Sequence, residues 1–347
     1  MSTANKGEWS EFYVLLKLLA DRNIFAADEN INRIEKSRRP IIKIFGDNGL
    51  EYRFDTSGNV KIYVNDELRG KVAADEVKTA AEYIYQEIMN GKKNFEIDGA
   101  DELMKKFWRD KIKADSRRKA DIKFQVHDVS TGENPVCRYS IKSYLGSPPT
   151  LFNAGVSTNF KFELPDVTAA QIDEINSAEK FADKLKLIGT LNFIGVKNKI
   201  FAGNLSLICT SLEKYLAEML KIFYRGGCTN CAELVIKLEE NNFMNLERVD
   251  AYRYKIKKFL SAAALGMTAG TEWNGREDAD SGYIIVKKSG EILAYHLLTR
   301  NDFETYLLNN TKFDTPKPYR HKFGKVYAEG GKYFIDLNLQ VRFKDIK

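Results

Sequence analysis

The chain has few of the residues that build disulfide frameworks and metal clusters. Its 347 residues include only four cysteines and three histidines, and four cysteines in a chain of this length do not make a disulfide framework. Cys228 and Cys231 form one CxxC pair, but Cys137 and Cys209 stand alone, so no second pair completes the usual spacing of a zinc site. The histidines lack the ligand spacing of an HNH-type nuclease. The counts favour a protein whose cysteines remain reduced thiols.

Long hydrophobic runs are also missing. The longest apolar stretches, such as residues 12–16, fall far short of a membrane span, and the N-terminus lacks the apolar core of a signal peptide. No GxxxxGK[ST] loop and no GxGxxG after a strand is present, which disfavours nucleotide-powered remodelling and dinucleotide redox chemistry. With 44% hydrophobic and 29% charged residues, we expect a globular cytoplasmic protein.

The charge of the chain permits a polyanionic partner without requiring one. Lysine and arginine number 54 and the acidic residues 48, for a formal charge of +6. Basic residues cluster at 105–123, 248–258 and 312–325. Each cluster is compatible with a solvated surface, but a run of positive charge would also suit a phosphate backbone.

Hydrophobic periodicity predicts an α/β (α+β) protein. A helix is expected at 8–20, short strands at 40–45, 51–54 and 60–64, and helices at 74–89 and 100–109. The segment 169–267 is expected to be mainly helical, with helices near 169–188, 204–224, 231–241 and 251–265, and strands return after 282. We therefore expect three parts: a core in residues 1–165, a mainly helical lobe in 166–268, and an α+β C-terminal part in 269–347 that packs on the core.

A predicted β-hairpin is the most informative part of the chain. The runs 120–124 and 138–143 flank a turn signal at 130–135. Pairing that is symmetric about Thr131 and Gly132 would place Asp121 opposite Lys142. Ser140 would then face Lys123. Because side chains alternate along a strand, Ser140 and Lys142 share one face. An ordinary cross-strand ion pair on a surface hairpin is the alternative.

The first predicted helix carries two carboxylates near its N-terminus. Glu8 and Glu11 are three residues apart, so they project from the same face. Acidic residues also stabilise the positive end of a helix dipole, which explains such a pair without any function.

The order of these elements resembles the PD-(D/E)xK nuclease superfamily. The resemblance rests on Asp121, on the x-x-Lys ending at Lys142, and on Glu11 in the first helix. There are two departures: Ala120 replaces the proline of the motif, and Ser140 stands where a second carboxylate is usual. Either the Ser140 hydroxyl takes that place, or Glu163 supplies the missing carboxylate.

The whole chain is similar to the HpaII family of type II restriction endonucleases. Three segments carry this resemblance: NKGEWSE from Asn5 with the leucine-rich run after it, YSIKSYLGSPPTLFNA at 139–154, and LNLQVRF at 337–343. It implies a restriction-endonuclease-like mixed central sheet flanked by helices, with an additional largely helical lobe. It also implies Mg²⁺-dependent cleavage of double-stranded DNA at a short palindrome, with CCGG the namesake site.

This resemblance implies a role for each site residue. Asp121, the backbone carbonyl of Ile141 and a carboxylate of the first helix, Glu11 before Glu8, would hold Mg²⁺. Lys142 would orient the attacking water or neutralise charge on the phosphorus. A palindromic target suits a homodimer, although a monomer that cuts one strand at a time is possible.

Base reading requires donors for guanine and acceptors for cytosine. The loop 274–280, in the C-terminal part 269–347 that we expect to recognise DNA, and the turn 153–159 are candidates. Solvated connectors are the alternative for both. The DNA-binding candidates are Lys119, Lys123, Asn153, Arg276, Glu277 and Asp278. Two other functions remain open: a DNA-binding protein with a degenerate nuclease fold, and a repair nuclease that recognises DNA structure.

Overall fold

The computed structural model describes residues 2–28, 30–112, 120–129, 131–296 and 300–345. The chain forms two compact units. Unit 1 contains residues 1–149, 278–303 and 345–347, and unit 2 contains 150–277 and 304–344. The boundaries of these units differ from those expected from the sequence, which fell after residues 165 and 268. Within the described ranges, no helix combines the length and apolar character needed to cross a membrane.

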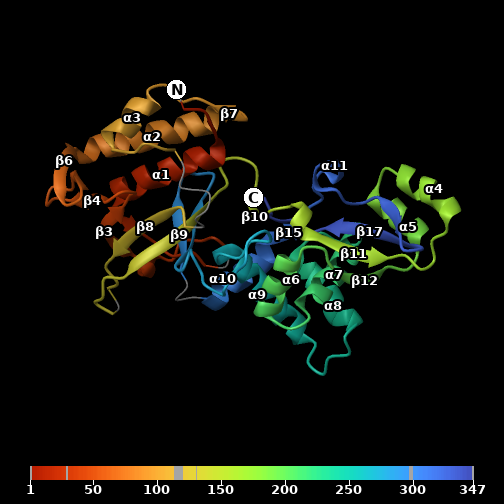
Figure 1. Cartoon of the computed structure of the whole chain (residues 1–347). Coiled ribbons are helices and arrows are strands. Elements are labelled where there is room, and N and C mark those ends of the chain that lie inside the picture. The colour runs from red at the N-terminus through yellow and green to blue at the C-terminus, as the bar shows by residue number, and fades with distance from the viewer. Residues whose placement is uncertain (1, 29, 113–119, 130, 297–299, 346–347) are drawn as a thin grey trace. The chain divides into compact units, whose positions relative to one another are not determined.

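A mixed sheet forms the centre of unit 1 (Figure 1). β13 pairs with β9 in parallel, and the other neighbours in the sheet pair antiparallel. In the described part of the chain its strand order is β14 (Ile292–His296), β13 (Gly282–Val286), β9 (Val136–Ser143), β8 (Ile122–Val126), β3 (Arg39–Phe45), β4 (Leu50–Phe54), β5 (Val60–Val64) and β6 (Glu67–Val72), with β2 (Asn23–Ile24) beside β3.

Helices cover one face of this sheet. α1 (Lys6–Asp21) and α2 (Ala74–Asn90) lie side by side in Figure 1, and α3 (Ala100–Lys106) follows them in the chain. A capping box starts α1: the Glu8 N–H donates to the Asn5 side chain, and the Asn5 N–H donates to the Glu8 carboxylate. The buried stripe of α1 packs with the apolar residues of the sheet in one core. β1 (Ala4–Asn5) pairs with β7 (Asn94–Phe95) beside these helices.

The alternation of side chains gives the sheet a core face and an outer face. In β8, Ile122 and Phe124 are buried in the core. Asp121 and Lys123 therefore point to the outer face. This alternation decides which polar residues can meet across neighbouring strands.

Unit 2 combines two smaller antiparallel sheets with most of the remaining helices. One sheet has the order β12 (Asn192–Val196), β11 (Asn159–Glu163), β17 (Lys332–Asn338) and β16 (Val326–Glu329), and the other has the order β10 (Thr150–Phe152), β18 (Val341–Phe343) and β15 (Thr311–Phe313). The helices are α4 (Ile172–Ser177), α5 (Phe181–Ile188), α6 (Lys199–Ile208), α7 (Leu212–Tyr224), α8 (Cys231–Asn241), α9 (Asp250–Leu265), most of α10 (Arg300–Asn310) and α11 (Pro318–His321).

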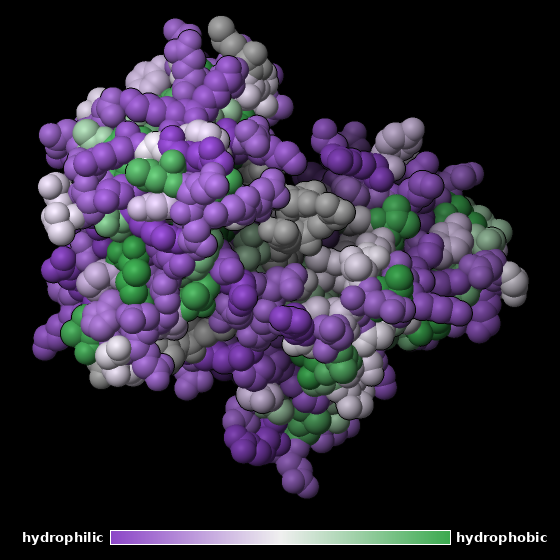
Figure 2. Space-filling view, turned by 60° about the vertical axis from the view of Figure 1, so that its left-hand side comes forward, coloured by the Kyte–Doolittle hydropathy of each residue, from purple (hydrophilic) through white to green (hydrophobic). Residues whose placement is uncertain are grey.

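The observed elements confirm the expected mixed central sheet with flanking helices. The predictions of single helices at 169–188 and 204–224 were wrong, because each of these segments is interrupted. Ala178 is extended between α4 and α5, and Ser211 has a left-handed backbone (φ 64°) between α6 and α7. Figure 2 shows hydrophilic side chains over most of the visible face, with small hydrophobic groups between them. Scattered apolar residues of this kind are normal on a protein surface.

Candidate active site

The predicted register of the hairpin was wrong by two residues. β8 and β9 pair Ile122 with Tyr139 and Lys123 with Arg138, so Asp121 precedes β8 at the level of Ser140. The turn closes earlier than expected, because Asp128 N–H donates to the carbonyl of Glu133. A shift of two residues preserves the alternation of side chains. Asp121, Ser140 and Lys142 therefore still share the outer face.

Asp121 is tied to β9 through both its backbone and its side chain. Its N–H donates to the Tyr139 carbonyl at 2.9 Å. Its Oδ2 accepts a hydrogen bond from the Ile141 N–H at 2.6 Å and from the Ser140 hydroxyl at 3.0 Å. Two donors on one oxygen restrict the rotation of the carboxylate. Ser140, which is 2% exposed, thus orients Asp121 from the position where a second carboxylate is usual.

Lys142 is half-buried beside an aromatic ring that the sequence did not identify. Its Nζ lies 5.1 Å from the ring centroid of Tyr283, and Tyr283 reaches this place because β13 runs parallel to β9 with Tyr283 level with Ser140. Burial lowers the pKa of the Lys142 ammonium, while the carboxylates of Asp121 and Glu11 act in the opposite direction. Two carboxylates and an aromatic ring thus act on the Lys142 ammonium.

α1 brings Glu11 to the hairpin. The Ser10 hydroxyl lies 2.6 Å from the Lys6 carbonyl and 2.7 Å from Ser143 Oγ on β9. This contact is buried and anchors the first half of the helix beside the strand that carries Lys142. Glu8 instead caps the helix, because its carboxylate accepts a hydrogen bond from the Asn5 N–H at the start of α1. The geometry thus favours Glu11 over Glu8 as the helix carboxylate of the site.

Arg109 is another charged residue that interacts with Glu11, and the sequence analysis did not single it out. Burial lowers the pKa of its guanidinium, and the charges of Tyr52, Glu11 and Asp47 oppose that effect. Its side chain donates to the backbone carbonyls of residues 111 and 112. The sequence showed Arg109 only as one member of a basic run, and nothing in that run distinguished it from its neighbours.

The donor set suits a hard cation that retains water ligands. The N–H and C=O of one strand residue point to the same side, so the Ile141 carbonyl faces the side on which its N–H meets Asp121. Asp121, Glu11 and this carbonyl offer only oxygen atoms. Among the described residues, no group of three or more His, Cys, Asp or Glu side chains is arranged to hold a metal ion. The residues therefore fit a cation held by one or two carboxylates and completed by water.

Glu163 has an ion-pair partner of its own. It belongs to β11 of unit 2, where its carboxylate pairs with Lys332 at 2.7 Å. All the residues that gather at the hairpin belong to unit 1. The Ser140 hydroxyl, which contacts Asp121, is thus the better candidate for the position of the second carboxylate.

The candidates for DNA binding lie in several places. Lys123 is on the outer face of β8, two residues from Asp121. Asn153 is exposed after β10, and the loop with Arg276, Glu277 and Asp278 carries the chain from unit 2 back to unit 1. Arg276 is exposed, and its carbonyl accepts a hydrogen bond from the Trp273 indole. Lys119 lies outside the described residues.

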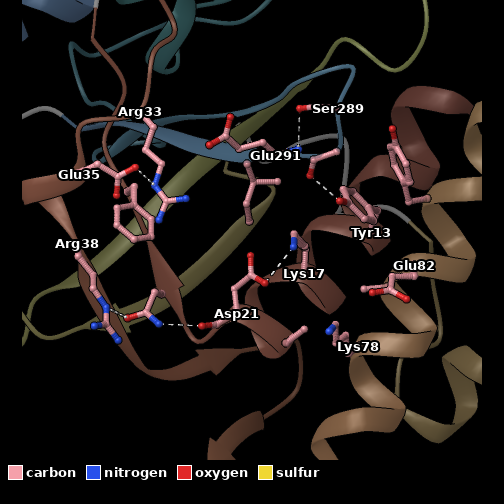
Figure 3. Close-up of a pocket in the computed structure, with 17 residues that line it drawn as sticks. Tyr13, Lys17, Asp21, Arg33, Glu35, Arg38, Lys78, Glu82, Ser289 and Glu291 are labelled. Atoms are coloured by element: carbon pink, nitrogen blue, oxygen red, sulfur yellow. Dashed lines mark hydrogen bonds and ion pairs between the residues drawn. The ribbon is translucent and has the colours of Figure 1, made fainter.

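A cavity of about 1050 Å³ in unit 1 lies away from the hairpin residues. It is lined by the second half of α1, by α2, by residues 23–38 and by the turn at 289–292. Figure 3 shows charges of both signs around it, with Lys17 paired to Asp21 and Arg33 to Glu35. None of Asp121, Ser140 and Lys142 contributes to its lining, so it is separate from the candidate active site.

Known proteins resemble this chain over nearly its whole length. The family model for the HpaII restriction endonuclease matches residues 5–343. The type II restriction enzyme HpaII of Haemophilus parainfluenzae is 38% identical, with 98% of each chain covered. No solved structure shows significant similarity. The match of the family model and the identity across the full length establish that the chain belongs to the HpaII restriction endonuclease family.

Proposed function

We propose that this restriction endonuclease hydrolyses double-stranded DNA at CCGG with Mg²⁺ as its cofactor. Restriction endonucleases generally use divalent metal ions, and the oxygen donors of the hairpin support Mg²⁺ in particular. The observation that carries the proposal is the convergence of Asp121 and Lys142 on one face of the sheet, with Glu11 of α1 beside them. A palindromic target suits a two-fold dimer, and a monomer that cuts the strands in turn is the alternative.

Asp121, Glu11 and the Ile141 carbonyl would hold the metal ion. When bound there, Mg²⁺ supplies charge that polarises a phosphoryl oxygen and lowers the pKa of a coordinated water. The chain supplies the orientation. Ser140 and the Ile141 N–H fix the Asp121 carboxylate, and the anchoring of α1 at Ser143 fixes the position of Glu11.

Lys142 acts on the phosphate directly. Its ammonium neutralises negative charge that develops on the phosphoryl oxygens as the water attacks. The neighbouring carboxylates favour the protonated form against the effect of burial. Because the ammonium is half-buried, its charge is screened less than that of an exposed lysine, which strengthens its effect on the reacting phosphate.

Two substitutions test the assignment. Asp121→Ala and Lys142→Ala should each reduce cleavage of a plasmid with Mg²⁺ by at least a thousandfold, while DNA binding in EDTA changes less than threefold. The reason is that both groups act on the reacting phosphate and the ion rather than on the bulk of the DNA. Wild-type protein should give discrete fragments, whose sequenced ends identify the target. Persistent cutting by either variant would refute the role of that residue.

The two alternative functions, a DNA-binding protein and a repair nuclease, would give different results in the same assay. A DNA-binding protein with a degenerate site would shift DNA and cut nothing with any divalent ion. A repair nuclease would prefer nicked, flapped or mismatched duplexes over an intact CCGG duplex. Discrete fragments from intact plasmid exclude both.

A further inference from the structure

Four cations stand directly opposite one another across four neighbouring strands. The register pairs Lys43 of β3 with Arg53 of β4, Arg53 with Lys61 of β5, and Lys61 with Lys71 of β6. We call these four residues the cation row. At the usual spacing of strands, such a row covers roughly 14 Å of the sheet.

The cation row lies on the face that carries the active-site residues. In β5, Val60 and Ile62 are fully buried in the core, so Lys61 between them points to the outer face. Lys123 of β8 pairs across the strands with Phe45, which is two residues from Lys43. The ammonium groups of Lys43 and Lys123 both approach the Phe45 ring, at 4.8 Å and 4.6 Å from its centroid. Positive charge therefore continues from the row to within two residues of Asp121.

This arrangement is unfavourable for the free protein. Like charges directly opposite each other destabilise a sheet. Glu51 relieves part of the repulsion by pairing with Lys43 at 3.0 Å and with Arg53 at 2.6 Å. Asp55 pairs with Lys71 at 2.9 Å. Lys61 lies inside the row, between Arg53 and Lys71, and has no ion-pair partner among the described residues. Its charge is therefore available to bind another molecule.

We propose that the cation row binds the phosphate backbone of DNA beyond the cleaved site. This inference rests on the proposed function, since it assumes that DNA is the substrate of the neighbouring site. One strand of DNA carries a phosphate about every 3.4 Å along the helix axis, so the row is long enough to meet about four of them. Lys61 thereby gains a counter-charge that the described part of the free protein does not supply.

The salt dependence of binding tests the cation row. Lys61→Gln removes the charge and keeps most of the side-chain length. Losing one phosphate contact should make the slope of log K against log salt less negative by about 0.9, where K is the association constant. Binding should weaken about five- to tenfold at 0.1 M salt. Both effects should be equal on duplexes with and without CCGG, because backbone contacts carry no sequence information. Binding is measured in EDTA so that no DNA is cut.

Two matched variants serve as controls. Lys61→Arg keeps the charge and should retain the wild-type slope. Lys78→Gln removes an exposed lysine from α2, which packs on the core face, and should leave binding unchanged. A Lys61→Gln protein with wild-type slope and affinity would overturn the inference, and so would weakened binding to the CCGG duplex alone. Cleavage by wild-type protein is scored separately, so the inference can fail while the proposed function stands.

Discussion

At the scale of single residues, the site depends on contacts that hold charged groups in place. Tyr283 is 1% exposed, and its ring centroid lies 5.1 Å from Lys142 Nζ and 5.3 Å from the ring centroid of Phe303. Burial, then the charge of Asp121, raises the pKa of its phenol well above the ordinary value, so the hydroxyl stays protonated. A neutral ring beneath an ammonium attracts the cation and restricts its position.

Replacing Tyr283 should therefore slow the reaction without weakening DNA binding. Tyr283→Leu removes the ring and should lower kcat about tenfold, since a desolvated cation–π contact contributes about 1–2 kcal/mol. Tyr283→Phe keeps the ring and should remain within about threefold of wild type. The measurement is single-turnover cleavage at saturating DNA.

Tyr295→Leu is the matched control for this prediction. Tyr295 pairs with Tyr283 across the strands and is also fully buried. Its loss should lower stability about as much as the loss of Tyr283 and leave kcat unchanged. Equal losses of kcat in the two leucine variants would mean that Tyr283 acts only through packing.

At the scale of elements, Glu51 links two strands of the outer face and, through Arg53, the turn between β5 and β6. Its carboxylate on β4 pairs with Lys43 of β3 and with Arg53, which also pairs with Asp66 just before β6. Burial alone would raise the pKa of Glu51, but hydrogen bonds from Lys43 and Arg53 lower it overall from 4.5. A depressed carboxyl pKa means that Glu51 stabilises the fold above pH 4.5, and that this stability is lost as the pH falls below that value.

Glu51→Gln tests this pH dependence. At pH 7 the variant should be less stable by roughly 1 kcal/mol, because the cation row loses its shared anion. Between pH 5 and pH 3 its stability should fall less steeply than that of wild type. Urea unfolding across this range provides the measurement. Parallel curves for the two proteins would show that Glu51 does not titrate with a lowered pKa.

At the scale of the whole molecule, unit 1 is built from distant parts of the chain. β13 and β14 come after residue 277, yet β13 completes the sheet beside β9 and brings Tyr283 to Lys142. Unit 2 is formed largely by residues 150–277, which lie in the sequence between the two main segments of unit 1. The residues that surround the hairpin of Asp121 and Lys142 are therefore not all contained in the first 165 positions.

A fragment of residues 1–165 should consequently fail to fold. Without β13, strand β9 would become an unpaired edge, and the buried side chains of Ile141 and Tyr139 would lose neighbours. We expect no cooperative thermal transition by circular dichroism and no cleavage, whereas the full chain should show both. A sharp transition in the fragment would contradict this account of unit 1.

The sequence alone determined the local features of this protein. The apolar spacing predicted the helix that carries Glu11, and alternation in the hairpin predicted that Ser140 and Lys142 share a face. The resemblance of whole segments predicted the family, which the comparisons confirmed. Local periodicity suffices for these features because it depends only on the 3.6-residue and two-residue repeats of helix and strand.

Only the tertiary structure decided which residues meet. The turn set the register that places Asp121 beside Ser140, and a parallel strand some 140 residues later brought Tyr283 beneath Lys142. The opposed charges of Lys43, Arg53, Lys61 and Lys71 likewise depend on strand pairing. Register and long-range pairing follow from how the whole core packs, and a residue's own neighbours in the sequence do not contain that information.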